Sequence, residues 1–166
     1  MHFTYCPDCG EKTTLRVIGD EGAVPYCTHC DRPLFDLFPT CVLSVLVNAA
    51  GEIALIRQSY GQQTYFVGVS GYMKPGETAE QAAARELTEE IGIAPQSLTY
   101  RFSAWHESGG QLMLCFSAFA EKTAFTLSDE VATAQWFSPK EALGAVRPGS
   151  IIARLTASVC ADMNKS

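Results

Sequence analysis

Three glutamates in one short stretch are the residues best placed to do chemistry. Glu86, Glu89 and Glu90 stand at positions i, i+3 and i+4, so a helix would put their carboxylates on one face. Like charges this close repel, and a hard cation such as Mg²⁺, which takes oxygen ligands, would neutralise them. A solvated acidic helix face is the alternative explanation. The preceding Gly71 and Pro75–Gly76 favour a metal site, because they predict a tight loop leading to a helix N-terminus, whose dipole favours anions.

Four cysteines near the start of the chain have the spacing of a second metal site. Cys6 and Cys9 form one C-x2-C pair, and Cys27 and Cys30 form another. Each pair can direct two thiolates at one tetrahedral Zn²⁺, which predicts a four-cysteine zinc ribbon. Two disulfides are the alternative, which the lack of a visible export signal argues against. Four thiolates already complete a closed site, so His29 is not expected as a ligand.

The ribbon is expected to be a small module over residues 1–38 that depends on its structural Zn²⁺ for folding. A module below about 40 residues has too little core to fold alone. Three basic and six acidic residues give it a net charge of −3 before thiolates are counted: Lys12, Arg16 and Arg32 against Asp8, Glu11, Asp20, Glu21, Asp31 and Asp36. A surface that follows phosphates needs the opposite sign. We therefore interpret the ribbon as a structural or dimerising module, and a homodimer is the expected assembly.

Composition limits the function classes of the whole chain. Its 166 residues are 47% hydrophobic and 18% charged, with a formal net charge of −6. The acidic balance argues against broad binding to nucleic acid or anionic lipid. No apolar run approaches the roughly 18 residues of a membrane span. We expect a cytoplasmic protein that has no membrane segment.

Alternating and periodic patterns predict the elements that position the glutamates. Strands are expected at 41–47, 53–56, 65–69, 98–105, 112–120 and 134–137. Thr78 with Gln81 predicts a capping box that begins a helix ending at Ile91, where Gly92 stops it. Ser138 and Ser150 begin two further helices. Mixed strands with few helices indicate a layered α/β domain over residues 39–166. The three isolated cysteines are expected in its core: Cys41, Cys115 and Cys160.

The stretch from Gly71 to Ile93 matches a family signature. It fits G-x5-E-x7-R-E-U-x-E-E-x-G-U at every fixed position: Gly71, Glu77, Arg85, Glu86, Leu87, Glu89, Glu90, Gly92 and Ile93. The chain thus resembles the Nudix hydrolases. The resemblance implies an α/β/α sandwich around a mixed β-sheet, and hydrolysis of a nucleoside diphosphate derivative with Mg²⁺ or Mn²⁺. It also implies that Glu86, Glu89 and Glu90 ligate the metal, with Glu89 preferred as general base, and that Arg85 holds a glutamate in place.

The resemblance extends to the NADH pyrophosphatase branch of this family. That branch has a four-cysteine ribbon directly before the Nudix domain, a Tyr-Pro linker similar to Phe38–Pro39, and a Pro-Gly-(Ser/Thr) segment similar to 147–155. By the same resemblance, Glu130 is a further metal-binding glutamate, and the backbone carbonyl of Ser70 joins the metal site.

One departure affects specificity. The branch's S-Q-P-W-P-F-P-x-S-L-M motif is replaced here by the segment Ser103–Met113, which has a glycine turn in place of a proline-aromatic loop. The resemblance therefore supports the chemistry more strongly than a preference for NAD(H). Phe38, Tyr72 and Trp105 are candidate substrate-binding residues that could stack on a nucleobase, and core packing is the alternative for each.

Three functions remain open. The leading one is cleavage of the pyrophosphate bond of NADH, ADP-ribose or a related dinucleotide or nucleotide sugar. The second is the same chemistry on a nucleotide-capped RNA, against which the acidic charge counts. The third is a non-catalytic nucleotide sensor, against which the complete signature counts.

Overall fold

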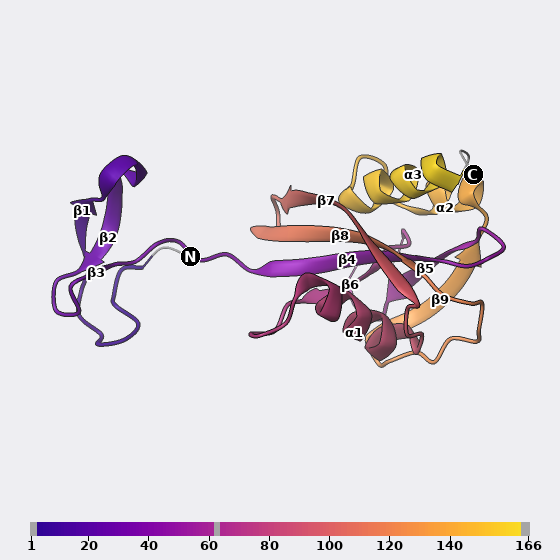
Figure 1. Cartoon of the computed structure of the whole chain (residues 1–166), viewed down its shortest axis with the longest axis horizontal. Helices are drawn as coiled ribbons and strands as arrows, with labels where there is room; N and C mark the ends of the chain where they lie inside the picture. The colour runs from indigo at the N-terminus through magenta and orange to yellow at the C-terminus, as the bar shows by residue number, and fades with distance from the viewer. Residues whose placement is uncertain (1–2, 62–63, 164–166) are drawn as a thin grey trace. The chain divides into compact units, whose positions relative to one another are not determined.

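The computed structural model describes residues 3–61 and 64–163 of the chain. The chain consists of two compact units, Met1–Phe38 and Pro39–Ser166. The first is a small sheet and the second a larger unit of sheet and helices (Figure 1). No helix formed by the described residues combines the length and the apolarity that a membrane crossing requires.

The first unit is a three-stranded antiparallel sheet held by a very small core. Its strands lie in the order β1-β2-β3, and a short 3-10 turn, Gly19–Glu21, joins the first two. The strands are β1 (Thr14–Val17), β2 (Ala23–Cys27) and β3 (Arg32–Pro33). The buried cluster of this unit contains Cys6, Cys27 and Leu34. Two of these three residues are cysteines, so little apolar packing is available to hold the sheet.

The second unit is built on a mixed six-stranded sheet. Its elements are β4 (Thr40–Val47), β5 (Ile53–Gln58), β6 (Val69–Tyr72), α1 (Ala79–Ile91), β7 (Ser97–His106), β8 (Gln111–Phe119), β9 (Val131–Phe137), α2 (Pro139–Ala145) and α3 (Ile151–Met163). The strand order is β7-β8-β4-β5-β9, and β6 also pairs with β4. Strand β4 runs parallel to β8, whereas the other pairs are antiparallel.

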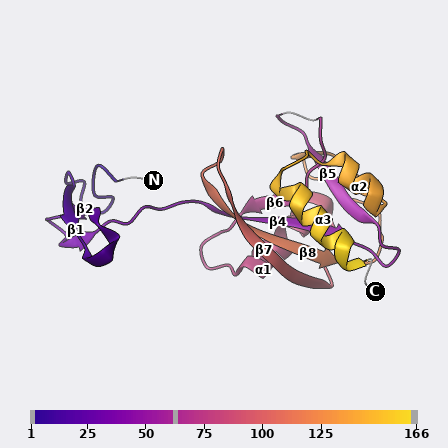
Figure 2. The ribbon, with the colours of Figure 1, turned by 90° about the horizontal axis from the view of Figure 1, so that it is seen from above.

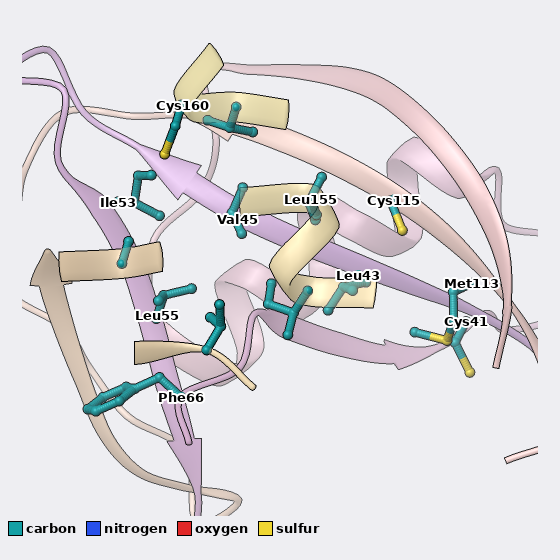
Figure 3. Close-up of a cluster of buried hydrophobic side chains, with 14 residues drawn as sticks. Cys41, Leu43, Val45, Ile53, Leu55, Phe66, Met113, Cys115, Leu155 and Cys160 are labelled. Carbon is teal, nitrogen blue, oxygen red and sulfur yellow. The ribbon is translucent and has the colours of Figure 1, made fainter. Parts of the chain in front are cut away.

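Helices cover both faces of this sheet. Successive side chains of a strand point to opposite faces, and β4 follows this rule. Its Cys41, Leu43 and Val45 join the buried cluster that contains α2 and α3 residues (Figure 3), whereas Val42 and Leu46 pack on the α1 side. Figures 1 and 2 show α2 and α3 over one face and α1 over the other. The predicted α/β/α sandwich around a mixed sheet is therefore confirmed.

The predicted helix caps are confirmed in their atomic detail. The Thr78 hydroxyl accepts from the Gln81 backbone N–H at 3.3 Å, and the Gln81 side chain accepts from the Thr78 N–H at 2.9 Å. Gly92 ends α1 with φ of 73°, in the left-handed region that glycine adopts without strain. Ser138 and Glu141 form a second capping box at α2. The sequence therefore sets both ends of α1, the helix that carries the glutamates.

One predicted strand lies in a different place. The pattern at 65–69 predicts a strand, but the paired strand β6 begins at Val69 and runs to Tyr72. Phe66 and Val67 make single bridges to two different partners, Val146 and Ile56. The apolar run is therefore packed into the core without forming one ladder, and its last residue starts the strand.

The isolated cysteines are buried, as predicted. Cys41, Cys115 and Cys160 are each less than a tenth exposed. Burial raises the pKa of the Cys115 thiol to about 12 and raises the pKa values of the other two. These thiols therefore stay protonated and serve as apolar core residues.

Candidate active site and zinc ribbon

The four N-terminal cysteines converge on one point. Each offers one sulfur, and the four sulfurs lie within 4.8 Å of one another. The Sγ atoms of Cys6 and Cys30 are 3.9 Å apart, and those of Cys9 and Cys27 are 3.5 Å apart. Among the described residues this is the one tight group of potential metal ligands, and it does not include His29. Four convergent sulfurs fit the closed tetrahedral site of a zinc ribbon.

These thiols have different pKa values because they lie so close together. A backbone N–H at Cys9 lowers the pKa of Cys6 to about 7. Hydrogen bonding with Cys9, together with burial, raises the pKa of Cys30 to about 12. Four thiolates this close repel one another, so a bound cation is needed for all of them to ionise at neutral pH.

Arg85 of α1 organises Glu77, which precedes the helix, and Glu86 and Glu89 in its second half. Its Nε and Nη2 donate to both carboxylate oxygens of Glu77, at 2.6 and 3.0 Å. Nη1 donates to Glu86 at 2.5 Å and to Glu89 at 3.0 Å, and Nη2 also donates to the Tyr72 carbonyl at 3.1 Å. The pKa of Glu77 falls to about 2, first because of the Arg85 hydrogen bonds. Arg85 therefore holds three signature carboxylates and the Tyr72 carbonyl in one geometry.

Glu90 differs from its neighbours because it is buried without a cation. Its residue is 7% exposed, and no Lys or Arg within the described residues forms an ion pair with it. Burial, followed by the charges of Glu86 and Glu130, raises the pKa of Glu90 to about 8, opposed by a backbone hydrogen bond at Ser70. A buried carboxylate surrounded by other carboxylates is costly unless a cation joins it. This oxygen-only donor set fits Mg²⁺ or Mn²⁺.

A distant loop brings Glu130 to the end of α1. The Ser128 N–H donates to the Glu90 carbonyl at 3.1 Å, which fixes the loop against the last turn of the helix. The Ser59 N–H donates to the Glu130 carbonyl at 2.8 Å, and the Ser59 hydroxyl donates to the Asp129 carbonyl at 2.7 Å. Backbone bonds from two other segments therefore place Glu130 beside Glu90.

Gly71 makes room for a carboxylate. It lies in β6, paired with Val42 of β4. A Cβ atom at Gly71 would overlap the Glu86 carboxylate. The first glycine of the signature is therefore required by the close approach of α1 to this strand, since any side chain there would displace the Glu86 carboxylate.

The carboxylates face a pocket of about 530 Å³, which we call the carboxylate pocket. Its walls come from β4, β5, β6, α1 and β8 and from the loops beside them. The lining residues are Cys41, Gln58, Tyr60, Ser70, Gly71, Tyr72, Lys74, Arg85, Glu86, Glu89, Gln111, Met113 and Glu130. Glu90 does not line it, as expected from its burial.

A second pocket of about 470 Å³ shares a wall with the first, and we call it the adjoining pocket. The shared residues are Gln58, Ser70, Gln111 and Met113. Its other lining residues are Leu43, Val67, Trp105, His106, Arg147, Pro148, Gly149, Ser150, Ile151 and Ile152. Two joined pockets, one lined by carboxylates and one by mainly apolar and neutral groups, suit a substrate with a charged centre and a larger organic part.

Two of the three candidate stacking residues line the pockets of the second unit. Tyr72 lines the carboxylate pocket, where its hydroxyl donates to Gln111 at 3.3 Å, and Trp105 lines the adjoining pocket. Phe38 is the last residue of the first unit and is about half exposed, and its role in substrate binding stays a prediction. Ser70 lines both pockets.

Sequence reasoning missed several pocket residues, among them Gln58, Tyr60 and Arg147. Gln58 ends β5 and Tyr60 follows it, and the Gln58 amide donates to the Tyr60 hydroxyl at 3.0 Å. Burial and the charges of Glu130 and Glu90 raise the pKa of Tyr60, which places its hydroxyl near the acidic cluster. Arg147 lies in the Pro-Gly loop that resembles the branch's own segment. A charged side chain beside that motif is the signal that could have identified it.

Sequence comparisons agree with these features. The family profile described as the NUDIX domain matches residues 37–155. The chain is 34% identical over 154 residues to the NAD-capped RNA hydrolase NudC of Haemophilus influenzae (strain PittGG), which is 90% of this chain and 57% of that protein. It is 28% identical over 153 residues to NudC of Chromobacterium violaceum, covering 92% of this chain and 57% of that protein. The chain therefore spans less than two thirds of the length of these relatives.

Solved structures share the fold. A NUDIX hydrolase from Nitrosomonas europaea matches with a TM-score of 0.76 at 18% identity, covering 99% of this chain and 94% of that one. The NUDIX domain of NrtR from Shewanella oneidensis, crystallised with ADP ribose, matches with a TM-score of 0.64 at 16% identity, covering 85% and 94%.

Proposed function

The chain belongs to the Nudix hydrolase family, and we propose that it hydrolyses the pyrophosphate bond of a nucleoside diphosphate derivative such as NADH, ADP-ribose or a related dinucleotide or nucleotide sugar. One observation carries the proposal. Glu90 is buried without a cation beside Glu86 and Glu130, and these two neighbours line a pocket large enough for a diphosphate. A solvated acidic helix face would leave this carboxylate exposed.

We assign the catalytic cation, Mg²⁺ or Mn²⁺, to Glu86, Glu89, Glu90, Glu130 and the Ser70 carbonyl. When bound, such a cation neutralises the diphosphate and lowers the pKa of the attacking water. The oxygen-only donors and the buried Glu90 support this assignment. The raised pKa of Glu90 is then expected to fall once the cation is present.

The side chains divide the remaining work. Glu89 is half exposed and faces the pocket, so it can accept the proton of the water that attacks one phosphorus atom. The bond from that phosphorus to the bridging oxygen breaks, and two phosphate monoesters leave. Arg85 fixes Glu86 and Glu89 through its hydrogen bonds, and Lys74 lies 3.7 Å from Glu89, beside the same pocket. Tyr72 and Trp105 are proposed to stack on the organic groups of the substrate.

We propose that the ribbon binds Zn²⁺ in a structural role and that the protein works as a homodimer in the cytoplasm. Four free thiols at one site suit a reducing compartment. Leu15 and Val17 of β1 are more than two thirds exposed, which supports an interface role for the ribbon. Sedimentation of the full chain, with Leu15→Ser and Val17→Ser variants, tests the dimer.

A substrate screen tests the function. The purified chain would be incubated with NADH, ADP-ribose and nucleotide sugars, with Mg²⁺ or Mn²⁺, and AMP release measured. We expect metal-dependent turnover of at least one substrate. Absent turnover across the set would instead favour a non-catalytic nucleotide sensor, and metal-independent turnover would contradict the assigned role of the cation.

The altered segment Ser103–Met113 predicts weak selection for nicotinamide. We expect NADH to show little advantage over ADP-ribose in kcat/KM, since a glycine turn replaces a rigid loop. An advantage of about a hundredfold, or roughly 2.7 kcal/mol, would contradict this expectation.

Removal of the cap from NAD-capped RNA is the second candidate, because the curated relatives carry that name. The net charge of −6 counts against tight RNA binding. Comparing kcat/KM for NAD-capped RNA and free NAD⁺ decides it, since a true RNA substrate would be preferred with a steep salt dependence.

A further inference from the structure

Arg147 differs from the other arginines of the chain. Four of the seven form ion pairs with Asp or Glu, and two lie over aromatic rings: Arg16 with Asp31, Arg32 with Asp8, Arg85 with Glu77, Arg101 with Asp162, Arg57 over Phe66 and Arg154 over Phe102. Within residues 3–61 and 64–163, no hydrogen bond, ion pair or ring contact engages the Arg147 guanidinium. It is the arginine available to bind something else.

The backbone at Arg147 is anchored on both sides. Its carbonyl accepts from the Ser150 hydroxyl at 2.6 Å, and the preceding Val146 is buried and bridges to Phe66. Pro148 follows and restricts the loop further. A side chain on such a loop is presented from a fixed point, and here it lines the adjoining pocket.

Charge changes sign between the two joined pockets. Glu86, Glu89 and Glu130 line the carboxylate pocket, whereas no Asp or Glu is among the residues that line the adjoining pocket. Among the described residues, Arg147 is the one Lys or Arg that lines the adjoining pocket. A cation without a protein counter-charge in this position complements an anionic group of the substrate.

The hydrolysed pyrophosphate is not the expected partner of Arg147. That group must lie among the glutamates and their cation, in the pocket that Arg147 does not line. The adjoining pocket has room for a nucleoside, with Trp105 and aliphatic walls to contact it. A guanidinium at its edge has the planar fork of donors that matches a phosphate group.

We propose that Arg147 is a specificity residue that binds an additional phosphate monoester on the ribose of the substrate, one outside the hydrolysed pyrophosphate. The preferred substrate class is then a nucleoside diphosphate derivative with a third phosphate. This inference rests on the proposed function.

Turnover of a matched pair tests the specificity. NADPH and NADH differ by one ribose phosphate, so the ratio of their kcat/KM values isolates its contribution. We expect the wild type to prefer NADPH by about tenfold or more, as a charge-assisted hydrogen bond allows. Arg147→Met should remove most of that preference, mainly through the KM for NADPH. Arg147→Lys should retain part of it.

Lys140→Met is the control. Lys140 is an exposed cation in α2 that lines neither pocket, so this variant makes the same charge change and should keep the wild-type ratio. Coincident thermal melts of Arg147→Met and the wild type show that the variant is folded. A wild type without the preference overturns the proposal. An Arg147→Met variant that keeps the wild-type ratio also overturns it, whether its two kcat/KM values are unchanged or fall by the same factor.

A binding measurement separates this proposal from the proposed function. Calorimetry of the zinc-loaded protein without added Mg²⁺ would compare AMP with adenosine 2′,5′-bisphosphate and adenosine 3′,5′-bisphosphate. We expect one bisphosphate to bind about tenfold tighter than AMP, and Arg147→Met to lose that difference. A retained difference without turnover of any substrate overturns the hydrolase but supports the Arg147 site. Equal binding of all three by the wild type overturns the Arg147 site, whatever the turnover.

Discussion

The protein contains two clusters of side chains that we assign to metal ions, and they are assembled in different ways. In the ribbon, four sulfurs from two short knuckles lie within 4.8 Å of one another. In the second unit, three glutamates share α1, but the fourth, Glu130, arrives from a loop that follows β8. The first cluster is specified mostly by local spacing, and the second requires a folded sheet to complete it.

The two clusters also differ in what holds them. The ribbon's buried cluster has Cys6, Cys27 and Leu34 at its centre, so the site and the core are largely the same residues. The second unit packs three separate buried clusters against its sheet. Metal is therefore expected to control folding in the ribbon, whereas in the second unit it is expected to control activity.

The largest effect is expected from removing a sulfur ligand. In the full chain, Cys9→Ser should abolish zinc binding and unfold residues 3–38, because the metal supplies most of the folding free energy of a module this small. Amide hydrogen exchange should show lost protection in the ribbon and unchanged protection in β4, β5 and β8. Metal analysis should find about one zinc per chain in the wild type and none in the variant.

His29→Ala is the matched control. His29 is exposed and lies inside the second knuckle, outside the sulfur cluster, so its loss should leave zinc content and exchange unchanged. A Cys9→Ser protein with a fully protected ribbon would show that packing alone holds this unit.

The next effect is on catalysis. Glu90→Gln keeps the side chain's shape and removes a buried charge that no described cation pairs with. Turnover should fall at least about a hundredfold. Stability of the metal-free variant should match the wild type below about pH 4.3, the ordinary pKa of a glutamate. It should exceed the wild type increasingly from there to about pH 8, because burial and the charges of Glu86 and Glu130 keep the Glu90 carboxyl protonated in the fold while the unfolded chain ionises.

Thermal melts with and without Mg²⁺, run beside an AMP-release assay, measure both changes. Glu80→Gln makes the same substitution at an exposed position of the same helix, so its turnover should match the wild type. Near-native turnover of Glu90→Gln would mean that the catalytic assignment is wrong.

A smaller loss is expected at Glu130. Glu130→Gln should lower turnover less than Glu90→Gln, because three α1 glutamates still hold the cation. Raising the Mg²⁺ concentration should recover part of the activity if a ligand has been weakened. A loss of turnover as large as that of Glu90→Gln would show that Glu130 is as important for catalysis as the signature glutamates.

The smallest effect is a pH-dependent contribution from Glu77. The pKa of this carboxyl is lowered to about 2 by Arg85, whereas in the unfolded chain it is about 4.3. A lowered folded pKa gives stability that is fully present above about pH 4.3 and is lost as pH falls toward 2. Urea melts should therefore show a gap between the wild type and Glu77→Gln that shrinks across this range.

Glu121→Gln is the reference for the pH series. Glu121 is exposed and forms no ion pair within the described part of the chain, so its variant should follow the wild type at every pH. A constant gap for Glu77→Gln from pH 7 to 2.5 would show that the Glu77–Arg85 pair does not titrate as proposed.

Much of the site's helix could be predicted because its determinants are close in the chain. Thr78 and Gln81 cap one end of α1 and Gly92 the other. Between these caps, helical spacing alone puts Glu86, Glu89 and Glu90 within about a turn. Each of these features depends on contacts only three or four residues apart.

Two details of the site did not follow from that spacing. Helical spacing alone makes Glu86 and Glu90 equivalent, two like charges one turn apart. In the structure they differ, because Arg85 donates to Glu86 and not to Glu90. The strand expected at 65–69 begins instead at Val69. The ladder between this strand and β4 starts at the pair Val69 and Ser44, so the position of the strand depends on its partner. Burial and strand pairing are decided between segments that the sequence pattern does not connect.

The amino-acid sequence by itself determined the cysteine spacing of the ribbon, the limits of α1 and the set of carboxylates that one helix face presents. The tertiary structure alone decided that Ser59 and Ser128 hold Glu130 beside Glu90. It also decided that Arg147 lines a pocket while its guanidinium has no partner among the described residues. The reason is physical. Local features need only the geometry of one helix or turn, whereas a pocket exists only after distant strands have paired and their side chains have packed.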